Sequence, residues 1–366
     1  MMPGMDLRRR QHRLVFAAVA FVLAWLLAEI VLGITGWYKT PSERVYTDIY
    51  DAAYELLPNA PLRFGNSSIP SDPTNHAGFR GPEFRDEKAP GEYRVISIGD
   101  STTFGVMVPE PETYTRVSET LLRQKYGPRI QVLNAGVPGT NVYTHRLLFA
   151  KKLVHFLPDA AVVYLLFNSR AEIEVWRELE RRATRGETDS VNLAHQWLHR
   201  SKVYRLLRRM IKGGERSEVV SHIEAIRQTM ARRDPDEMRW VKAGLQEDLN
   251  GLFAQAEQNH VRLLIVHHLH RALVRECVAR LADPKLEPSG MASSLEEYMR
   301  FSRQICDARG VAFINPTEPF VAATAAGQEL FLDNEHFSPT GHRLMGELIA
   351  RYMMEHADYF GLAAGR

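Results

Sequence analysis

A serine, a histidine and an aspartate in this chain have the residue types of a hydrolytic triad. Ser101 follows an apolar run at 95–98 and is the third residue of Gly99-Asp100-Ser101. A strand that stops at a small turn and leaves a serine at its carboxyl end is a common way to present a nucleophile. The serine would also lie near a helix N-terminus, where backbone N–H groups stabilise negative charge.

A base for this serine is present near the other end of the chain. A serine hydroxyl is a poor nucleophile at neutral pH, so it needs a base within hydrogen-bond reach. His336 would accept the Ser101 proton, and Asp333 would hold the other ring nitrogen and stabilise the imidazolium. Both lie in one short loop before a predicted helix that has Ser338 as its N-cap and Pro339 at its first position.

Two residues between these ends are candidates for binding a developing oxyanion. Gly136 follows the apolar run 130–133, and a glycine there lets the backbone approach a ligand closely. Asn168 follows the run 161–167, and its amide is a further candidate donor. Each position also has a simpler interpretation, in which Gly136 belongs to an ordinary strand–turn–helix joint and Asn168 to an ordinary turn.

Taken together, these positions resemble the motifs of the SGNH hydrolase family, also called GDSL-type esterases. Ser101 is similar to the block I serine, Gly136 to the block II glycine and Asn168 to the block III asparagine. The Asp-x-x-His pair near the C-terminus is similar to block V. The order of the motifs also matches, and the resemblance covers roughly residues 93–354.

The resemblance implies a fold and a division of roles. It implies an α/β, flavodoxin-like three-layer fold with a parallel sheet between helices. It implies Ser101 as nucleophile and His336 as base, oriented by Asp333. The oxyanion hole would then consist of the N–H groups of Ser101 and Gly136 and the side-chain amide of Asn168.

The chain departs from the family pattern at two motifs. Residues 166–169 read Leu-Phe-Asn-Ser rather than Gly-x-Asn-Asp, and block I continues Thr-Thr-Phe-Gly rather than with leucine. These differences separate the chain from secreted lipases. It is more similar to membrane-anchored bacterial SGNH proteins, which also carry a segment like residues 75–83 before the first strand.

An apolar run at 14–34 is long enough to cross a bilayer as a helix. Arginines precede it at positions 8, 9, 10 and 13, so the positive-inside rule places residues 1–13 in the cytoplasm and the chain beyond residue 36 outside. A cleavable signal peptide is the alternative, but no clear small-x-small cleavage site follows the run. Glu29 inside the run is either a functional intramembrane carboxylate or a residue near the outer membrane interface or in a helix–helix contact.

The rest of the chain divides by composition. Residues 37–92 are rich in proline and glycine and read as an extracytoplasmic tether, free or packed on the domain. Alternating strand and helix patterns over 93–358 predict a parallel α/β domain, and the resemblance implies that this is the SGNH hydrolase domain. A charged helical insertion at about 170–237 interrupts them, and we expect it to form a lid or a wall of the substrate cleft. Within it, residues 199–212 form a basic amphipathic helix, suited either to a membrane surface or to packing on the domain.

Composition excludes some functions. The formal net charge of +2 over 366 residues argues against an electrostatically driven nucleic-acid binder. The sequence carries no Walker-type or dinucleotide fingerprint, so no nucleotide cofactor is expected.

Cys277 and Cys306 lie in predicted helices and are either free thiols or a disulfide.

A histidine cluster follows the predicted strand 262–267. His267, His268 and His270 could bind zinc, but adjacent residues on a strand point to opposite faces, so no metal site is expected. Contact with substrate is the preferred role for His267 or His268, and Asn141 is a further candidate for such a contact.

Three functions are compatible with these observations. The first is a serine esterase or deacylase that hydrolyses short-chain O-acyl esters, such as acetyl groups on an envelope or exported polysaccharide; this substrate is implied by the resemblance and the topology. The second is an O-acyltransferase that uses the same residues and excludes water. The third is a non-catalytic, glycan-binding or assembly protein on an SGNH scaffold. The sequence leaves protein partners and oligomeric state open.

Overall fold

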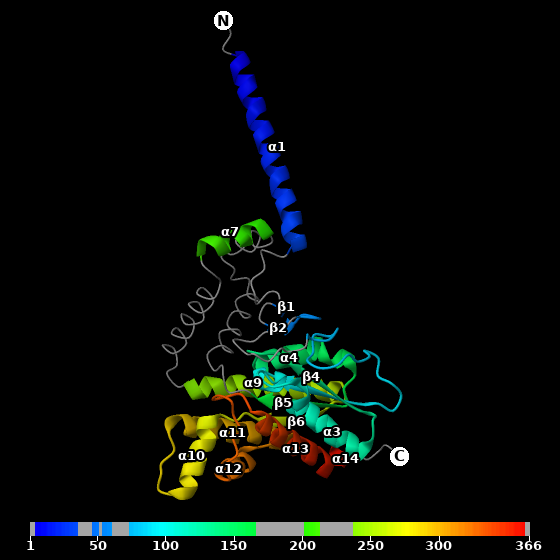
Figure 1. Ribbon diagram of the computed structural model, residues 1–366, viewed down its shortest axis with the longest axis vertical. Coiled ribbons are helices and arrows are strands. Elements are labelled where there is room, and N and C mark those ends of the chain that lie inside the picture. The colour runs from blue at the N-terminus through cyan, green and yellow to red at the C-terminus, as the bar shows by residue number, and fades with distance from the viewer. Residues whose placement is uncertain are drawn as a thin grey trace. The chain divides into compact units, whose positions relative to one another are not determined.

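The computed structural model of the protein describes residues 4–35, 46–50, 53–60, 73–165, 201–212 and 237–362. The chain forms two compact units (Figure 1). One consists of residues 1–44 and 179–226 and holds α1 (Gly4–Thr35) and α7 (Lys202–Lys212). The other consists of residues 45–178 and 227–366 and holds the sheet.

The larger unit is built on a five-stranded sheet in which every neighbouring pair is parallel. The strands are β3 (Tyr93–Gly99), β4 (Ile130–Gly136), β5 (Ala160–Leu165), β6 (Arg262–His267) and β7 (Ala312–Ile314). Their order is β4-β3-β5-β6-β7, which is the flavodoxin-like arrangement. The predicted parallel α/β sheet is therefore confirmed. A separate antiparallel pair is formed by β1 (Tyr46–Tyr50) and β2 (Ala53–Leu56).

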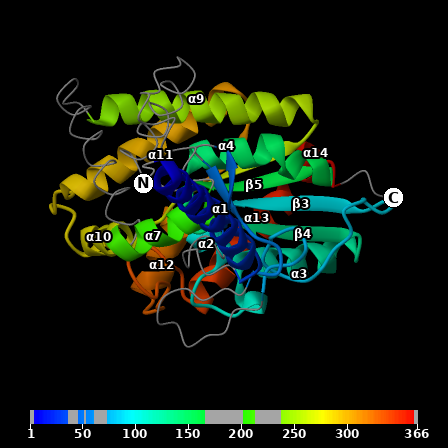
Figure 2. The ribbon, with the colours of Figure 1, turned by 90° about the horizontal axis from the view of Figure 1, so that it is seen from above.

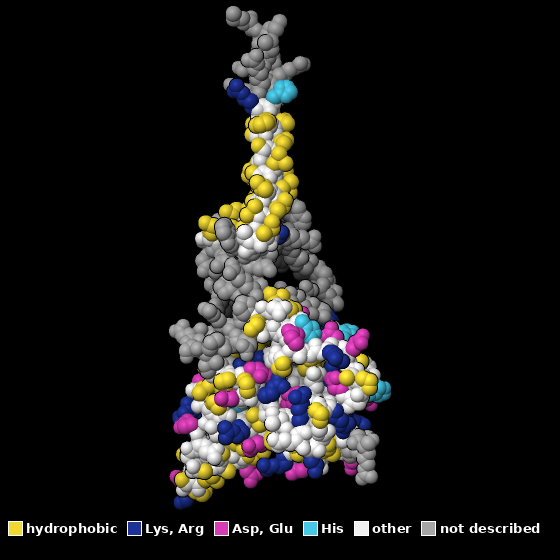
Figure 3. Space-filling model, turned by 45° about the vertical axis from the view of Figure 1, so that its right-hand side comes forward, with side chains coloured by type: hydrophobic (Ala, Val, Ile, Leu, Met, Phe, Trp, Pro, Cys, Tyr) yellow, Lys and Arg dark blue, Asp and Glu magenta, His cyan; other side chains and the backbone are white. Residues whose placement is uncertain are grey.

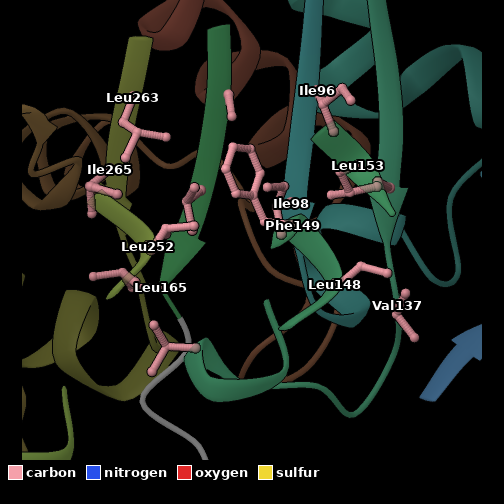
Figure 4. Packing of buried hydrophobic residues seen from close by; sticks show 14 of the residues in the cluster. Ile96, Ile98, Val137, Leu148, Phe149, Leu153, Leu165, Leu252, Leu263 and Ile265 are labelled. Carbon is pink, nitrogen blue, oxygen red and sulfur yellow. The ribbon is translucent and has the colours of Figure 1, made fainter. Parts of the chain in front are cut away.

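Side chains of the sheet alternate between two cores. Ile96 and Ile98 of β3 enter one core, whereas Val95 enters the other. The first core includes Phe149 and Leu252, and Figure 4 shows their side chains beside those of the strands. Because both faces are buried, the strands read in the sequence as continuous apolar runs rather than as alternating ones.

Helices cover both faces of the sheet (Figure 2). The first core contains residues of α4 (Val142–Lys151), α9 (Glu237–Gln258) and α11 (Gly290–Ala308). The second contains residues of α3 (Tyr114–Tyr126), α10 (Arg271–Ala282), α12 (Thr317–Ala325), α13 (Pro339–Glu355) and α14 (Ala357–Phe360). These three layers agree with the predicted fold.

Helix boundaries follow the capping residues. Asn141 and Thr144 form a capping box at the start of α4. Ser338 Oγ accepts a hydrogen bond from Gly341 N at 3.1 Å, with Pro339 at the first position of α13. Helix α4 stops at Lys151, and a 3₁₀ turn over Leu153–Phe156 follows it.

Residues 73–92, expected to belong to a tether, lie on the larger unit. Asn75 Oδ1 accepts hydrogen bonds from the N–H groups of Ala77 and Phe79 at 3.1 and 3.0 Å and folds the segment into a turn. Arg80 N then donates to Asn134 O of β4 at 3.1 Å. Of the two arrangements open for this segment, the structure has the packed one.

Both cysteines are free thiols. Cys306 of α11 is buried, and burial raises its pKa to about 12. A thiol with such a pKa stays protonated and unreactive at neutral pH.

The smaller unit contains the apolar N-terminal helix. Residues His12–Thr35 of α1 are long and apolar enough to cross a membrane, a property that signal sequences share. Figure 3 shows hydrophobic side chains along the coloured part of this helix. Of the predicted insertion, only residues 201–212 and 237 are described, so its role as a lid falls outside the described residues.

Candidate active site

The candidate nucleophile lies directly beyond the carboxyl end of β3. The strand ends at Gly99, and the one-turn helix α2 (Ser101–Phe104) follows. Asp100 caps this helix, because its Oδ1 accepts a hydrogen bond from Thr102 N at 2.8 Å. A Cβ atom on Gly99 would overlap Thr103 Oγ1, so glycine is required for α2 to pack this closely on the strand.

The candidate base and its aspartate lie in a short loop before α13. Phe331 and Phe337 form an antiparallel bridge across this loop, and Leu332 N donates to His336 O at 2.9 Å. Asp333 Oδ1 accepts hydrogen bonds from the N–H groups of Glu335 and His336, both at 2.8 Å. One carboxylate oxygen therefore holds the backbone of the loop and leaves the other oxygen for the imidazole.

Hydrogen bonds connect the three side chains in one line. Asp333 Oδ2 lies 2.7 Å from His336 Nδ1, and His336 Nε2 lies 2.9 Å from Ser101 Oγ. Thr102 Oγ1 also donates to Glu335 O at 3.4 Å, so helix α2 and the loop that carries His336 are in direct contact. Residues predicted from three separate positions in the sequence are thus brought together in a geometry that allows proton transfer from the hydroxyl.

The carboxylate of this line is held in its ionised form. Burial raises the pKa of Asp333, but hydrogen bonds from the His336 ring and from the backbone N–H groups of His336 and Glu335 outweigh it, and the net shift is downward. At neutral pH the carboxylate is therefore charged, as the stabilisation of an imidazolium requires.

Gly136 does not occupy the position expected of an oxyanion donor. Its N–H donates to Asn134 Oδ1 at 3.1 Å, and a Cβ atom on it would overlap Phe104 N of α2. The expectation that this N–H faces the substrate is corrected on that ground. Gly136 lets α2 lie directly on β4, which is a packing role next to the nucleophile.

A second glycine lies in the turn that follows β4. Val137 N and Thr140 Oγ1 both donate to Gly99 O, at 2.9 and 3.3 Å, so the turn lies beside the residue that precedes Asp100. Gly139 in this turn is exposed and has a φ of +82°. Among the residues that the structure describes, none accepts a hydrogen bond from its N–H.

Two other residues, Asn168 and Asn141, were expected at the site. Asn168 lies outside the described residues, and β5 ends three positions before it at Leu165. Asn141 is buried, and its Oδ1 accepts from Thr144 N at 3.1 Å as the cap of α4.

A match to a family model identifies the family of this chain. The model described as the GDSL-like lipase/acylhydrolase family matches residues 97–344. The chain belongs to this family. It is a GDSL-type serine hydrolase that acts on ester bonds.

Solved structures similar to this GDSL-type hydrolase include an esterase and a lipase/acylhydrolase, both of low identity. An acetyl-xylooligosaccharide esterase from Geobacillus stearothermophilus shares 14% identity, with 71% of this chain and 93% of that chain covered and a TM-score of 0.43. A lipase/acylhydrolase from Enterococcus faecalis shares 15% identity, with 72% and 96% covered and a TM-score of 0.42. No curated protein matches the chain. The family assignment rests on the family model alone.

The two histidines at the end of β6 point to opposite sides of the hydrolase sheet. The His267 ring lies 6.3 Å from that of Tyr298 in the first core, and the His268 ring lies edge-on to Tyr164 at 5.6 Å in the second. Burial lowers the pKa of both, to about 3 for His267, so both rings are neutral at pH 7. Within the described parts of the chain, no three His, Cys, Asp or Glu side chains form a group that could hold a metal ion.

Sequence reasoning missed Arg80, which binds the end of the nucleophile turn. Its buried guanidinium donates to Phe104 O at 2.8 Å, to Gly105 O and to Val108 O at 2.6 Å, and it lies over the Phe104 ring. The three carbonyls belong to the residues at and after the end of α2. Arg80 therefore joins the packed segment 73–92 to the helix that carries Ser101.

We expect Arg80→Ala to destabilise the hydrolase and to lower its activity. The carbonyls of Phe104, Gly105 and Val108 would lose a charged donor, which should cost roughly 3 kcal/mol of unfolding free energy. Urea unfolding would measure this change. The control is Arg85→Ala, because Arg85 lies in the same segment and is exposed. Equal stability of the two variants would contradict the role given to Arg80.

The buried cap of α2 predicts a pH dependence of stability. Burial raises the pKa of Asp100 from 3.8 to about 6. Between these values the folded protein holds a proton that the unfolded chain has released, so the unfolding free energy falls as pH rises from about 4 to about 6, by about 3 kcal/mol. Asp100→Asn keeps the Oδ1 acceptor and should remove this fall. Urea unfolding at several pH values tests it, and identical slopes in both proteins would contradict it.

Proposed function

We propose that this GDSL-type hydrolase cleaves short-chain O-acyl esters with Ser101 as nucleophile, His336 as base and Asp333 as its orienting carboxylate. The observation that carries the proposal is the hydrogen-bonded line from Asp333 Oδ2 through the imidazole to Ser101 Oγ, with separations of 2.7 and 2.9 Å. Retention of all three residues in contact also argues against the non-catalytic alternative.

In the proposed reaction, Ser101 Oγ attacks the acyl carbon while His336 Nε2 accepts the hydroxyl proton. The imidazolium then protonates the departing alcohol oxygen, and an acyl-enzyme remains. Water enters, gives a proton to His336, and its oxygen bonds to the acyl carbon. The bond between the acyl carbon and Ser101 Oγ then breaks. His336 returns the proton to Ser101 Oγ, and the carboxylic acid leaves.

The oxyanion of each tetrahedral intermediate needs hydrogen-bond donors. We assign this role to the N–H groups of Ser101 and Gly139, together with the Asn168 amide expected from the sequence. Support for Gly139 comes from its exposed position in the turn that is hydrogen-bonded to Gly99 O, and from an N–H that donates to no residue in the described part of the chain. The occupied N–H of Gly136 excludes that residue.

The proposed location is the extracytoplasmic side of a membrane. α1 would serve as an uncleaved single-pass anchor with the basic N-terminus in the cytoplasm. An acylated glycan or small molecule, with acetyl as the acyl group, is the proposed substrate. His268 follows the carboxyl end of β6, at the edge where ligands of such sheets bind, but its side chain is buried, so we assign it no substrate contact.

Release of free acid from a series of esters tests this function. The purified full-length protein should hydrolyse p-nitrophenyl acetate faster than the octanoate and release acetate from an acetylated polysaccharide in buffer alone. Acetate transfer that occurs only when a glycan acceptor is added would identify an acyltransferase instead. No turnover of either ester by folded protein would contradict the catalytic proposal.

A further inference from the structure

The strongest feature outside the active site is the contact between α1 and α7. Glu29 of α1 accepts hydrogen bonds from Ser201 Oγ, from Lys202 N at 2.9 Å and from Val203 N at 3.1 Å. Lys202 Nζ also donates to Glu29 O at 3.3 Å. The carboxylate thus caps the N-terminus of α7, where its charge also complements the helix dipole. Of the two roles left open for Glu29, the structure has the helix–helix contact.

The position of Glu29 along α1 places this contact near a bilayer boundary. The apolar segment His12–Thr35 has 24 residues, or about 36 Å of helix against a hydrocarbon core of about 30 Å. Glu29 lies six residues before Thr35, about 9 Å from that end of the helix. A centred span would therefore put Glu29 about 6 Å inside the boundary, which is the depth at which interfacial helices bury their apolar face.

The side chains of α7 suit such a surface. Leu207 and Met210 are 46% and 74% exposed, one helical turn apart, although both are apolar. Val203 and Leu206, which are half-buried, form one apolar stripe along α7 with Leu207 and Met210. The sequence between Arg200 and Lys212 adds lysines and arginines at most of the other positions, the composition of a helix that binds anionic lipid.

We infer that α7 lies on the extracytoplasmic surface of the bilayer that α1 spans, with Leu207 and Met210 in the acyl region and anionic phospholipid headgroups around its basic residues. This inference rests on the proposed membrane anchor. Continuity with the apolar surface of α1, through the contacts of Glu29, selects the bilayer as the occupant of the apolar stripe. Because residues 166–236 connect β5 to α9, the hydrolase chain then has a second attachment to the membrane inside its catalytic domain.

Fluorescence in lipid nanodiscs tests this placement with the full-length protein. Met210→Cys carries the fluorophore NBD in a Cys277→Ala background, in which Cys306 is fully buried and unreactive. The control is Leu281→Cys, because Leu281 is also apolar and 67% exposed but lies on α10. We expect doxyl-labelled lipid to quench the probe at 210 at least about threefold more than the probe at 281, and more strongly when the nanodisc contains phosphatidylglycerol.

A third probe separates failure of the inference from failure of the anchor. Leu23→Cys lies near the middle of the apolar segment and reports on α1 itself. Quenching at 23 without quenching at 210 would overturn the placement of α7 while the anchor stands. No quenching at either position would show that α1 does not span the bilayer.

Variants of Glu29 test the cap that connects the two helices. Glu29→Gln keeps the one acceptor oxygen that binds Ser201 Oγ and Val203 N and loses the one that binds Lys202 N, whereas Glu29→Ala keeps neither. We expect Glu29→Ala to reduce the quenching at position 210 by about twofold or more, and Glu29→Gln to restore most of it. Equal quenching in all three proteins would contradict the role of Glu29.

Discussion

Replacing Ser101 with alanine is expected to lower kcat/KM of the hydrolase for a soluble ester by roughly 10⁴-fold or more. The substitution removes the only atom placed to attack the acyl carbon in the hydrogen-bonded line. Ser101 Oγ makes one side-chain hydrogen bond, to His336 Nε2. Its loss should therefore change the free energy of unfolding by no more than about 1 kcal/mol. Steady-state kinetics and urea unfolding on the same preparation would measure both effects.

The pairing of Ser101 with His336 adds a stricter requirement. Residues that act as one catalytic unit are not additive, so the variant that lacks both side chains should be no slower than Ser101→Ala alone. Ser293→Ala is the matched control, because Ser293 is exposed on α11. A double variant that is slower by the product of the two single effects would contradict the shared role.

Asp333→Asn should produce the second large effect, a fall in kcat of roughly 10³- to 10⁴-fold. Asp333 Oδ1 accepts two backbone N–H groups and Oδ2 faces His336 Nδ1, so an asparagine that keeps Oδ1 in place must turn its NH₂ group toward the ring. The imidazole would then carry its proton on Nε2 and donate to Ser101, and it could not accept the hydroxyl proton.

The expected signature of Asp333→Asn is a loss of kcat with little change in KM or in folding. Asn334→Ala serves as the control, because Asn334 is exposed in the same loop. Its activity should stay within about threefold of wild type. An Asp333→Asn enzyme of near wild-type kcat would show that the carboxylate does not orient the base.

The sheet could be predicted from the sequence because both of its faces are buried. The strand predicted over residues 262–267 has the bounds that β6 has in the structure. The short loop that joins Asp333 to His336 could also be predicted, because only two residues separate them and both side chains therefore lie in one turn. The helix α12 was missed because nine residues give little periodic pattern.

Other parts of the site depend on contacts that spacing does not encode. Gly136 was the donor expected from the sequence, whereas Gly139 lies three residues further along, beyond the end of β4. Only the hydrogen bond from Gly136 N to Asn134 Oδ1 separates them. Arg80 and Glu29 act through partners 24 and 172 residues away or more, and nothing in the local sequence predicts such pairs.

The central claim, that Ser101 is an activated nucleophile, is tested most directly by covalent labelling. The full-length protein would be treated with a fluorophosphonate probe, digested and analysed by mass spectrometry, with Ser101→Ala and His336→Ala alongside. We predict a single adduct on the peptide that contains Ser101, absent from both variants. A folded wild-type protein that stays unlabelled, or an adduct on another residue that persists in Ser101→Ala, would contradict the account.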